Sequence, residues 1–149
     1  MAVFQWVILC ERAVVEEGAK TISLISILES IQLPTPPQDL TRSGQAIPLV
    51  PLRFFVVQQW SRSKPRVGER VPGRVRLIGP KKEFSAQEFV VDLTGSERAR
   101  VISQTIGFPL QGPGLYRCVI ETKLKMKWKT VGRTEFSVVY VDGGAARRH

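Results

Sequence analysis

Short segments of alternating apolar and polar residues, turn signals between them and the lack of a convincing helix predict an all-β fold: an antiparallel immunoglobulin-like β-sandwich of about eight strands. The most informative stretch runs from Gly112 to Ile120. A Gly-Pro-Gly turn precedes Tyr116 and Cys118, which fit the Gly-x-Tyr-x-Cys pattern of a tyrosine corner. In that motif the Tyr hydroxyl bonds to backbone just upstream, so we expect an interior strand that begins at about Leu115.

The N-terminal part of the chain predicts two strands. Residues 3–12 are apolar at both parities, which indicates a strand that is covered on both faces or has one face against a partner. Residues 20–31 form the second strand, and a change in the parity of its apolar residues near Ile25 predicts a β-bulge. A helix over residues 10–31 is the alternative, but the β-branched run and a glycine favour a hairpin.

The middle of the chain predicts a long connection and two further strands. Prolines between residues 34 and 51 remove hydrogen-bond donors, so this segment cannot continue a ladder. Residues 52–60 then form the third strand. After a basic loop, residues 70–78 form the fourth, with Arg74 and Arg76 pointing outward.

The last third of the chain predicts strands over 84–93, 98–107, the Tyr116 segment and 135–141. Beyond Ile120 the even positions stay apolar as far as Trp128, while the odd positions hold Lys123, Lys125, Lys127 and Lys129. A long ribbon would place all four lysines on one face and Trp128 on the other, with the turn near residues 130–133. Alternatively the turn falls earlier, within the lysine run, and breaks this ladder.

Length and composition indicate one domain over residues 1–142 and a flexible tail over 143–149. No run approaches the roughly 18 apolar residues of a membrane span. The apolar N-terminus lacks the basic leader and small-residue cleavage site of a secretion signal, so we expect a cytoplasmic protein. The sequence leaves the oligomeric state open.

The two cysteines are expected to be buried free thiols. Cys10, Trp60 and Cys118 follow the Cys, Trp, Cys order of antibody domains, but Cys10 lies in the first strand rather than the second. A chain without a secretion signal also resides where thiols stay reduced. A disulfide between the two remains the less favoured alternative.

Three segments resemble a family of small uncharacterised bacterial proteins with an immunoglobulin-like sandwich. They are the opening Ile8-Leu-Cys-Glu-Arg-Ala-Val-Val-Glu-Glu-Gly-Ala-Lys-Thr-Ile-Ser-Leu-Ile-Ser-Ile-Leu-Glu, the Gly112-Pro-Gly-Leu-Tyr turn, and Val131-Gly-Arg-Thr-Glu-Phe-Ser-Val. The resemblance covers the two ends of the chain better than the middle. It implies the same fold, and it implies no catalytic residues.

The residues available for chemistry argue against an enzyme. The only histidine is His149, the last residue, and the two cysteines have no neighbouring base or companion ligand. No phosphate-binding loop, nucleophile elbow or calcium loop is present. We therefore expect no cofactor and no metal. A closed pocket with converging acids would be needed to revive an enzymatic interpretation.

Charge is the one uneven feature. The chain has 22 Lys and Arg against 13 Asp and Glu, and the excess is concentrated in residues 52–82 and 117–133. In an immunoglobulin-like order, the third strand, the fourth strand and the last hairpin would share one sheet, so the basic groups would converge on one face. The candidate contacts are Arg62, Lys64, Arg66, Arg74, Arg76, Lys123, Lys125, Lys127 and Lys129.

These observations favour a noncatalytic interaction or accessory module of a bacterial multi-protein assembly, which binds an acidic protein surface through the basic sheet. The alternative is a nonspecific nucleic-acid binder that contacts phosphates. Specific base reading is not favoured because few aromatic residues share the expected basic face. A third possibility is that the lysines only keep an edge strand soluble.

Overall fold

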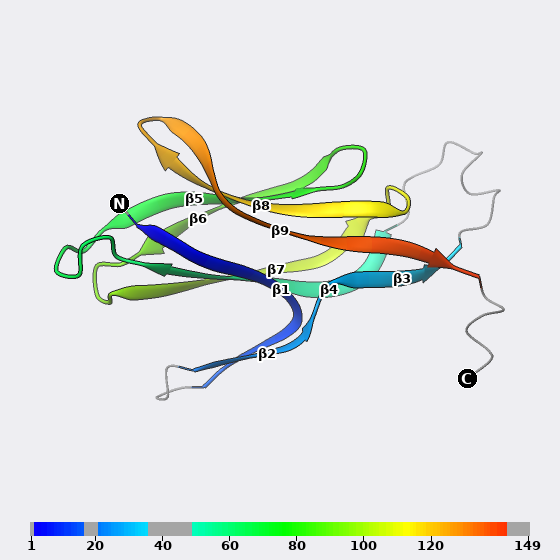
Figure 1. Ribbon diagram of the computed structural model, residues 1–149, viewed down its shortest axis with the longest axis horizontal. Helices are drawn as coiled ribbons and strands as arrows, with labels where there is room; N and C mark the ends of the chain where they lie inside the picture. Colours follow the sequence, from blue (N-terminus) through cyan, green and yellow to red (C-terminus); the bar gives the residue numbers. More distant parts are fainter. Residues whose placement is uncertain (1, 17–20, 36–48, 143–149) are drawn as a thin grey trace.

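The computed structural model describes residues 2–16, 21–35 and 49–142, and these residues form nine strands and no helix (Figure 1). The expected tail, 143–149, lies outside the described residues. The strands are β1 (Val3–Val15), β2 (Ile22–Ile27), β3 (Ser30–Pro34), β4 (Leu49–Ser61), β5 (Arg70–Ile78), β6 (Glu83–Asp92), β7 (Arg98–Pro109), β8 (Gly114–Leu124) and β9 (Lys127–Val141).

Two packed sheets form the sandwich. Sheet A has the order β2-β1-β4-β7, and sheet B has the order β3-β9-β8-β5-β6 (Figure 1). The run β9-β8-β5-β6 corresponds to the G, F, C and C′ order of an immunoglobulin variable-type sheet. The predicted all-β sandwich is therefore confirmed. One pair departs from the antiparallel expectation, because β3 runs parallel to β9.

The expected second strand over residues 20–31 divides between the two sheets. β2 pairs with β1 in sheet A, whereas β3 pairs with β9 in sheet B. Ser26 has a positive φ of 57°, and the buried Leu28 marks the crossing between the sheets. The β1–β2 ladder keeps its register, so the predicted bulge near Ile25 is wrong. The parity change in the sequence instead marks a chain that leaves one sheet and joins the other.

Aromatic rings fill the centre of the sandwich. Tyr116 and Phe136 stack with ring centroids 5.3 Å apart, and Phe108 meets both of them edge-on. Phe54 and Phe108 belong to sheet A, and Phe54 packs against Phe108 and against Phe136 of sheet B. Burial of such rings supplies most of the hydrophobic stabilisation of a sandwich core, and the edge-to-face contacts add about 0.5–1.5 kcal/mol each.

Tyr116 forms the predicted corner. Its hydroxyl accepts a 2.9 Å hydrogen bond from the Gln111 amide and donates one of 2.9 Å to the Gly112 carbonyl oxygen. Burial raises the pKa of Tyr116, with the Gln111 bond opposing part of that rise. The Gln111 side chain extends the corner, because its Oε1 accepts from the amides of Lys81 and Lys82. The corner thus joins the β5–β6 turn to the start of β8.

Both cysteines are free and buried, as the sequence predicts. Burial raises the pKa of Cys118 to about 12. Burial also raises the pKa of Cys10, although a backbone hydrogen bond near Arg12 lowers it in part. At neutral pH the thiolate form of each side chain is therefore scarce, and the thiolate is the reactive species.

The two sheets approach each other closely where Phe4 meets Gly132. A methyl group built on Gly132 would lie 2.2 Å from a carbon of the Phe4 ring. That ring in turn packs edge-on against Trp60, with centroids 5.3 Å apart. Glycine at this point of β9 lets a strand of sheet A cross directly over sheet B.

Tyr116→Phe should destabilise the fold although it removes a single oxygen. The Gln111 amide would be left buried without its acceptor, which costs about 1–3 kcal/mol. Tyr140→Phe is the control, since that hydroxyl has no hydrogen-bond partner among the described residues. Urea unfolding of both variants measures the difference, and equal midpoints would rule out the corner as a stabilising element.

Gly132→Ala should lower the free energy of unfolding by about 1–3 kcal/mol, because the new methyl group must displace the Phe4 ring in a packed core. Gly95→Ala is the matched control, since nothing lies within 4 Å of the methyl position there. Thermal melts of the two variants make the comparison. Similar melting temperatures would contradict the close approach of the two sheets.

Candidate functional site

The expected basic face is only partly assembled, because the predicted third strand, residues 52–60, does not lie in the same sheet as the other basic strands. Residues 52–60 belong to β4 in sheet A, whereas β5 and the β8–β9 hairpin lie in sheet B. This order follows the immunoglobulin pattern, in which the strand preceding C belongs to the opposite layer. The expectation that all three share one sheet is therefore wrong. Only Arg74, Arg76 and the hairpin lysines lie in one sheet.

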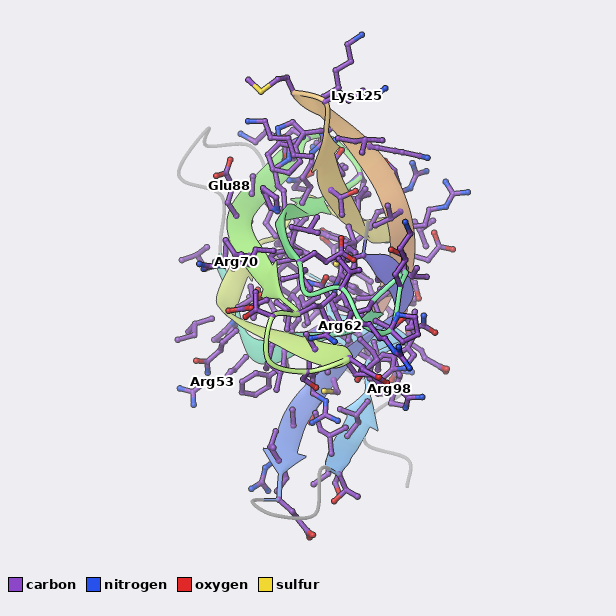
Figure 2. The ribbon with its side chains drawn as sticks, turned by 90° about the vertical axis from the view of Figure 1, so that its left-hand side faces the viewer. Arg53, Arg62, Arg70, Glu88, Arg98 and Lys125 are labelled. Atoms are coloured by element: carbon purple, nitrogen blue, oxygen red, sulfur yellow. The ribbon has the colours of Figure 1, made fainter. Side chains whose placement is uncertain are left out.

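The basic loop after β4 is separate from the lysine run. Its Arg62 is held by three backbone carbonyls: Nε donates to Leu93 at 2.8 Å, Nη1 to Pro65 at 2.7 Å and Nη2 to Thr94 at 2.9 Å. Arg62 therefore ties the β4–β5 loop to the β6–β7 loop. Lys64 and Arg66 are exposed in the same loop. Figure 2 shows Arg62 well apart from Lys125.

Arg74 and Arg76 converge on one nearly buried carboxylate. Arg74 Nε donates to Glu121 Oε2 at 2.7 Å, and Arg76 Nη1 lies 3.2 Å from Glu121 Oε1. The Glu121 side chain is only 7% exposed. Arg76 also pairs with Glu83 at 2.7 Å, and this bond raises the pKa of Arg76 further above its usual range. Neither arginine is an uncommitted charge available to a partner.

Strand β6 supplies further carboxylates to the outer face of sheet B. Glu88 lies opposite Arg74 in the β5–β6 ladder, and Asp92 lies opposite Arg70. Residues opposite each other in an antiparallel pair point to the same side of the sheet. The β5 part of this face is therefore mixed in charge rather than basic, and Figure 2 shows Glu88 on the same side of the molecule as Arg70.

The β8–β9 turn falls inside the lysine run, which is the second of the two alternatives open from the sequence. Lys125 and Met126 are the two turn residues, with φ values of 48° and 69°, and Leu124 pairs with Lys127 across the turn. Positive φ at both positions is the conformation of a type I′ hairpin. The alternation of one long ribbon is therefore broken, and the four lysines do not share a face.

We call residues 123–129 the lysine hairpin. Lys123 lies opposite Trp128, and Thr122 lies opposite Lys129, so Lys123 and Lys129 are on opposite sides of the ribbon. Beyond Thr122 the hairpin pairs with no other described strand, and it curls away from the sandwich (Figure 1). All four lysines are exposed, and none forms an ion pair within the described part of the chain.

Trp128 lies on the same side as Lys123 and Arg74, not on the opposite side as one long ribbon would require. The Arg74 guanidinium is 4.3 Å from the Trp128 ring centroid, and the Lys123 ammonium is 5.7 Å from it. Such cation–π contacts contribute about 0.5–1 kcal/mol each at exposed sites. The indole therefore anchors the base of the lysine hairpin to β5.

Sheet A presents a second surface, which the sequence indicated only through the two-sided apolar pattern of residues 3–12. A register shift between Phe4 and Trp6 turns Phe4 into the core and Trp6 outward. The cross-strand pairs then place a set of apolar side chains on the outer face of sheet A. They are Trp6, Ile8, Ile25, Ile27, Phe55, Val57, Ile102 and Ile106.

Arginines surround this apolar surface. Arg12 lies beside Ile25, Arg53 beside Ile106, and Arg98 and Arg100 occupy the start of β7. The strand residues described on this outer face include no carboxylate. Two shallow recesses of about 430 and 280 Å³ lie at the Arg98 end, lined by Gln5, Trp6, Gln59, Ser61, Ser96, Arg98, Ala99 and Arg100.

The described residues offer little for catalysis or metal binding. A recess of about 500 Å³ is lined by Arg117, Arg133, Thr134 and Glu135, and its lining includes a single carboxylate. Among the residues described, no three His, Cys, Asp or Glu side chains are grouped as metal ligands would be. None of the described segments is a helix of the length and apolarity that membrane crossing requires.

No protein family and no curated protein sequence matches the chain. Among solved structures, it is similar to the soluble domain of PmoD from Methylocystis sp. ATCC 49242 (Rockwell). The two share 9% identity, the match covers 93% of this chain and 98% of that one, and the TM-score is 0.37. A likeness of this size does not identify a shared function or shared site residues.

Glu121→Gln should destabilise the fold by about 2 kcal/mol, below the 3–5 kcal/mol typical of fully buried pairs, because Arg74 and Arg76 retain some solvent. The variant leaves two guanidinium groups against a neutral amide. Glu88→Gln is the control, since that exposed carboxylate faces Arg74 without a close ion pair. Chemical unfolding at neutral pH tests both, and equal effects would show that Glu121 is not the organising charge.

Proposed function

We propose that this chain is a noncatalytic interaction module of a bacterial multi-protein assembly in the cytoplasm, and that it attaches to an acidic protein surface through the lysine hairpin. The end motifs of the sequence support membership of the small bacterial immunoglobulin-like family that they resemble. The free, buried thiols are consistent with a reducing compartment. The scarcity of catalytic groups favours binding over chemistry.

One observation carries the proposal: Lys123, Lys125, Lys127 and Lys129 are exposed on a hairpin that extends beyond its sheet, and none has a carboxylate partner among the described residues. Arg74 and Arg76, by contrast, are already neutralised by Glu121 and Glu83. Among the candidate contact residues in sheet B, the charges without an ion pair are therefore those of the lysine hairpin. Clustered charges of one sign attract an oppositely charged partner and accelerate its encounter.

Nucleic acid is the second candidate, and Trp128 is the observation that favours it. An aromatic ring next to lysines is a common feature of single-strand binding surfaces. Here, however, Arg74 already covers the Trp128 ring at 4.3 Å, which leaves less of the indole available to stack on a base. The two candidates also differ in the salt dependence of binding, because phosphate contacts release condensed counterions.

Lys125→Glu/Lys127→Glu should weaken capture of the partner from the native host at least about tenfold, which corresponds to about 1.4 kcal/mol. Lys81→Glu/Lys82→Glu is the matched control, because it makes the same change in net charge at exposed lysines of the β5–β6 turn. Quantitative pull-down with nuclease treatment, followed by direct titration of the recovered protein, measures the effect. Both variants should melt like the parent protein.

Two outcomes would contradict the proposal. Equal loss of capture in both variants would show that net charge matters and the hairpin does not. The other outcome is nuclease-sensitive capture together with binding of an arbitrary duplex whose affinity falls roughly 10³-fold or more between 50 and 200 mM salt. That result would instead identify a phosphate-binding protein.

A further inference from the structure

We propose that the outer face of sheet A is a docking surface for an amphipathic, acidic helix of a partner protein. This surface is independent of the lysine hairpin, which belongs to sheet B. Figure 2 shows Arg53 and Arg98, which belong to the sheet A surface, toward the opposite end of the view from Lys125. Contact at one surface therefore leaves the other free.

Large apolar side chains are exposed on the outer face of sheet A. Ile25, Ile27, Ile102 and Ile106 are 43%, 57%, 39% and 72% exposed, although all four lie in strands. The outward faces of half-exposed sheets normally carry polar residues. A contiguous apolar surface with a polar rim is the usual sign of an interaction site.

The centre of the surface is well packed in the free chain. Val57 is fully buried between Ile8 of β1 and Ile102 of β7, although it points away from the core. Strands β1, β4 and β7 therefore present a firm apolar floor at this row rather than scattered side chains. Docking on such a floor costs little ordering of the sheet.

The arginines around the apolar residues indicate what kind of partner fits this surface. Arg12, Arg53, Arg98 and Arg100 surround the apolar residues, and the strand residues described on this face include no Asp or Glu. A second copy packed face to face would bring two sets of arginines together without a counter-charge, which is unfavourable. A partner with carboxylates on both sides of an apolar stripe would satisfy the arginines and cover the isoleucines together.

The dimensions fit a helix. Arg98 and Ile106 are eight residues apart on β7, and Arg53 lies opposite Ile106, so the arginines at the two ends are separated by about 26 Å at roughly 3.3 Å per residue. A helix of about 18 residues has the same length at 1.5 Å per residue. Its apolar stripe would lie along Ile102 and Ile106 of β7, and acidic residues at each end would reach Arg53 and Arg98.

The test uses two synthetic 18-residue helical peptides with the same leucine stripe, one with glutamates and one with lysines on its flanks. Binding to the full chain is followed by the fluorescence of Trp6 in a Trp128→Phe background, where the remaining Trp60 is fully buried. The acidic peptide should bind at least tenfold more tightly than the basic one. Arg53→Glu/Arg98→Glu should abolish this preference.

Two matched substitutions isolate the apolar contribution. Ile102→Asn should weaken binding of the acidic peptide at least fivefold. Val139→Asn should leave this binding unchanged, because Val139 is similarly exposed at 44% but lies in sheet B. If Ile102→Asn fails to melt cooperatively, the more exposed Ile106→Asn replaces it.

Three results would overturn the inference. They are equal binding of the two peptides, no effect of the isoleucine substitution, and a concentration-dependent dimer in sedimentation that Ile102→Asn dissociates. The last result would assign the surface to a second copy of the chain. Charge reversal at Lys125 and Lys127 changes none of these readouts, so failure here is distinguishable from failure of the lysine-hairpin proposal.

Discussion

The anchoring of the Tyr116 hydroxyl to the backbone at Gln111 and Gly112 is the constraint on which the rest of sheet B depends. It fixes where β8 begins, and the register of β8 then determines which residues of β5 and β9 lie opposite it. The same register sets Glu121 beside Arg74. An interior strand that is anchored near its first residues thus determines both the core and the charge pattern of one outer surface.

Net charge and local charge lead to different conclusions in this molecule. Strand β5 has a strongly basic sequence, yet the neighbouring strands β6 and β8 bring Glu83, Glu88 and Glu121 to its side chains. Lysines at the β8–β9 tip receive no such compensation among the described residues. The outer face of sheet A has fewer charges, but they are all of one sign among its described strand residues. Surface potential therefore follows strand order more closely than it follows composition.

Local patterns predicted much of the fold. The strand over Arg70–Ile78, the start of β8 and the corner at Tyr116 follow from turn residues and alternation, which are short-range signals. The assignment of β4 to the opposite sheet and the division between β2 and β3 were missed, because sheet membership depends on contacts distant in sequence. Gln111 was missed as well, since nothing in its neighbours reveals that its amide will meet Lys81 and Lys82.

For the candidate site, the sequence predicted the lysines as contact residues, which remains untested, and it did not predict their arrangement. The alternation from Lys123 to Lys129 left two arrangements open, one long ribbon with a single lysine face or an earlier turn within the run, and the structure has the turn at Lys125–Met126. Non-glycine residues in left-handed conformations cost about 1–2 kcal/mol each, and Asn-Gly is the usual choice at such positions. Met126 is nonetheless 84% exposed and contributes nothing to the core. Replacing this dipeptide with Asn-Gly would relax the backbone of the turn while removing the lysine and methionine side chains at the tip. The residues that would best stabilise the turn are therefore not the residues that present a charged and an apolar side chain to solvent.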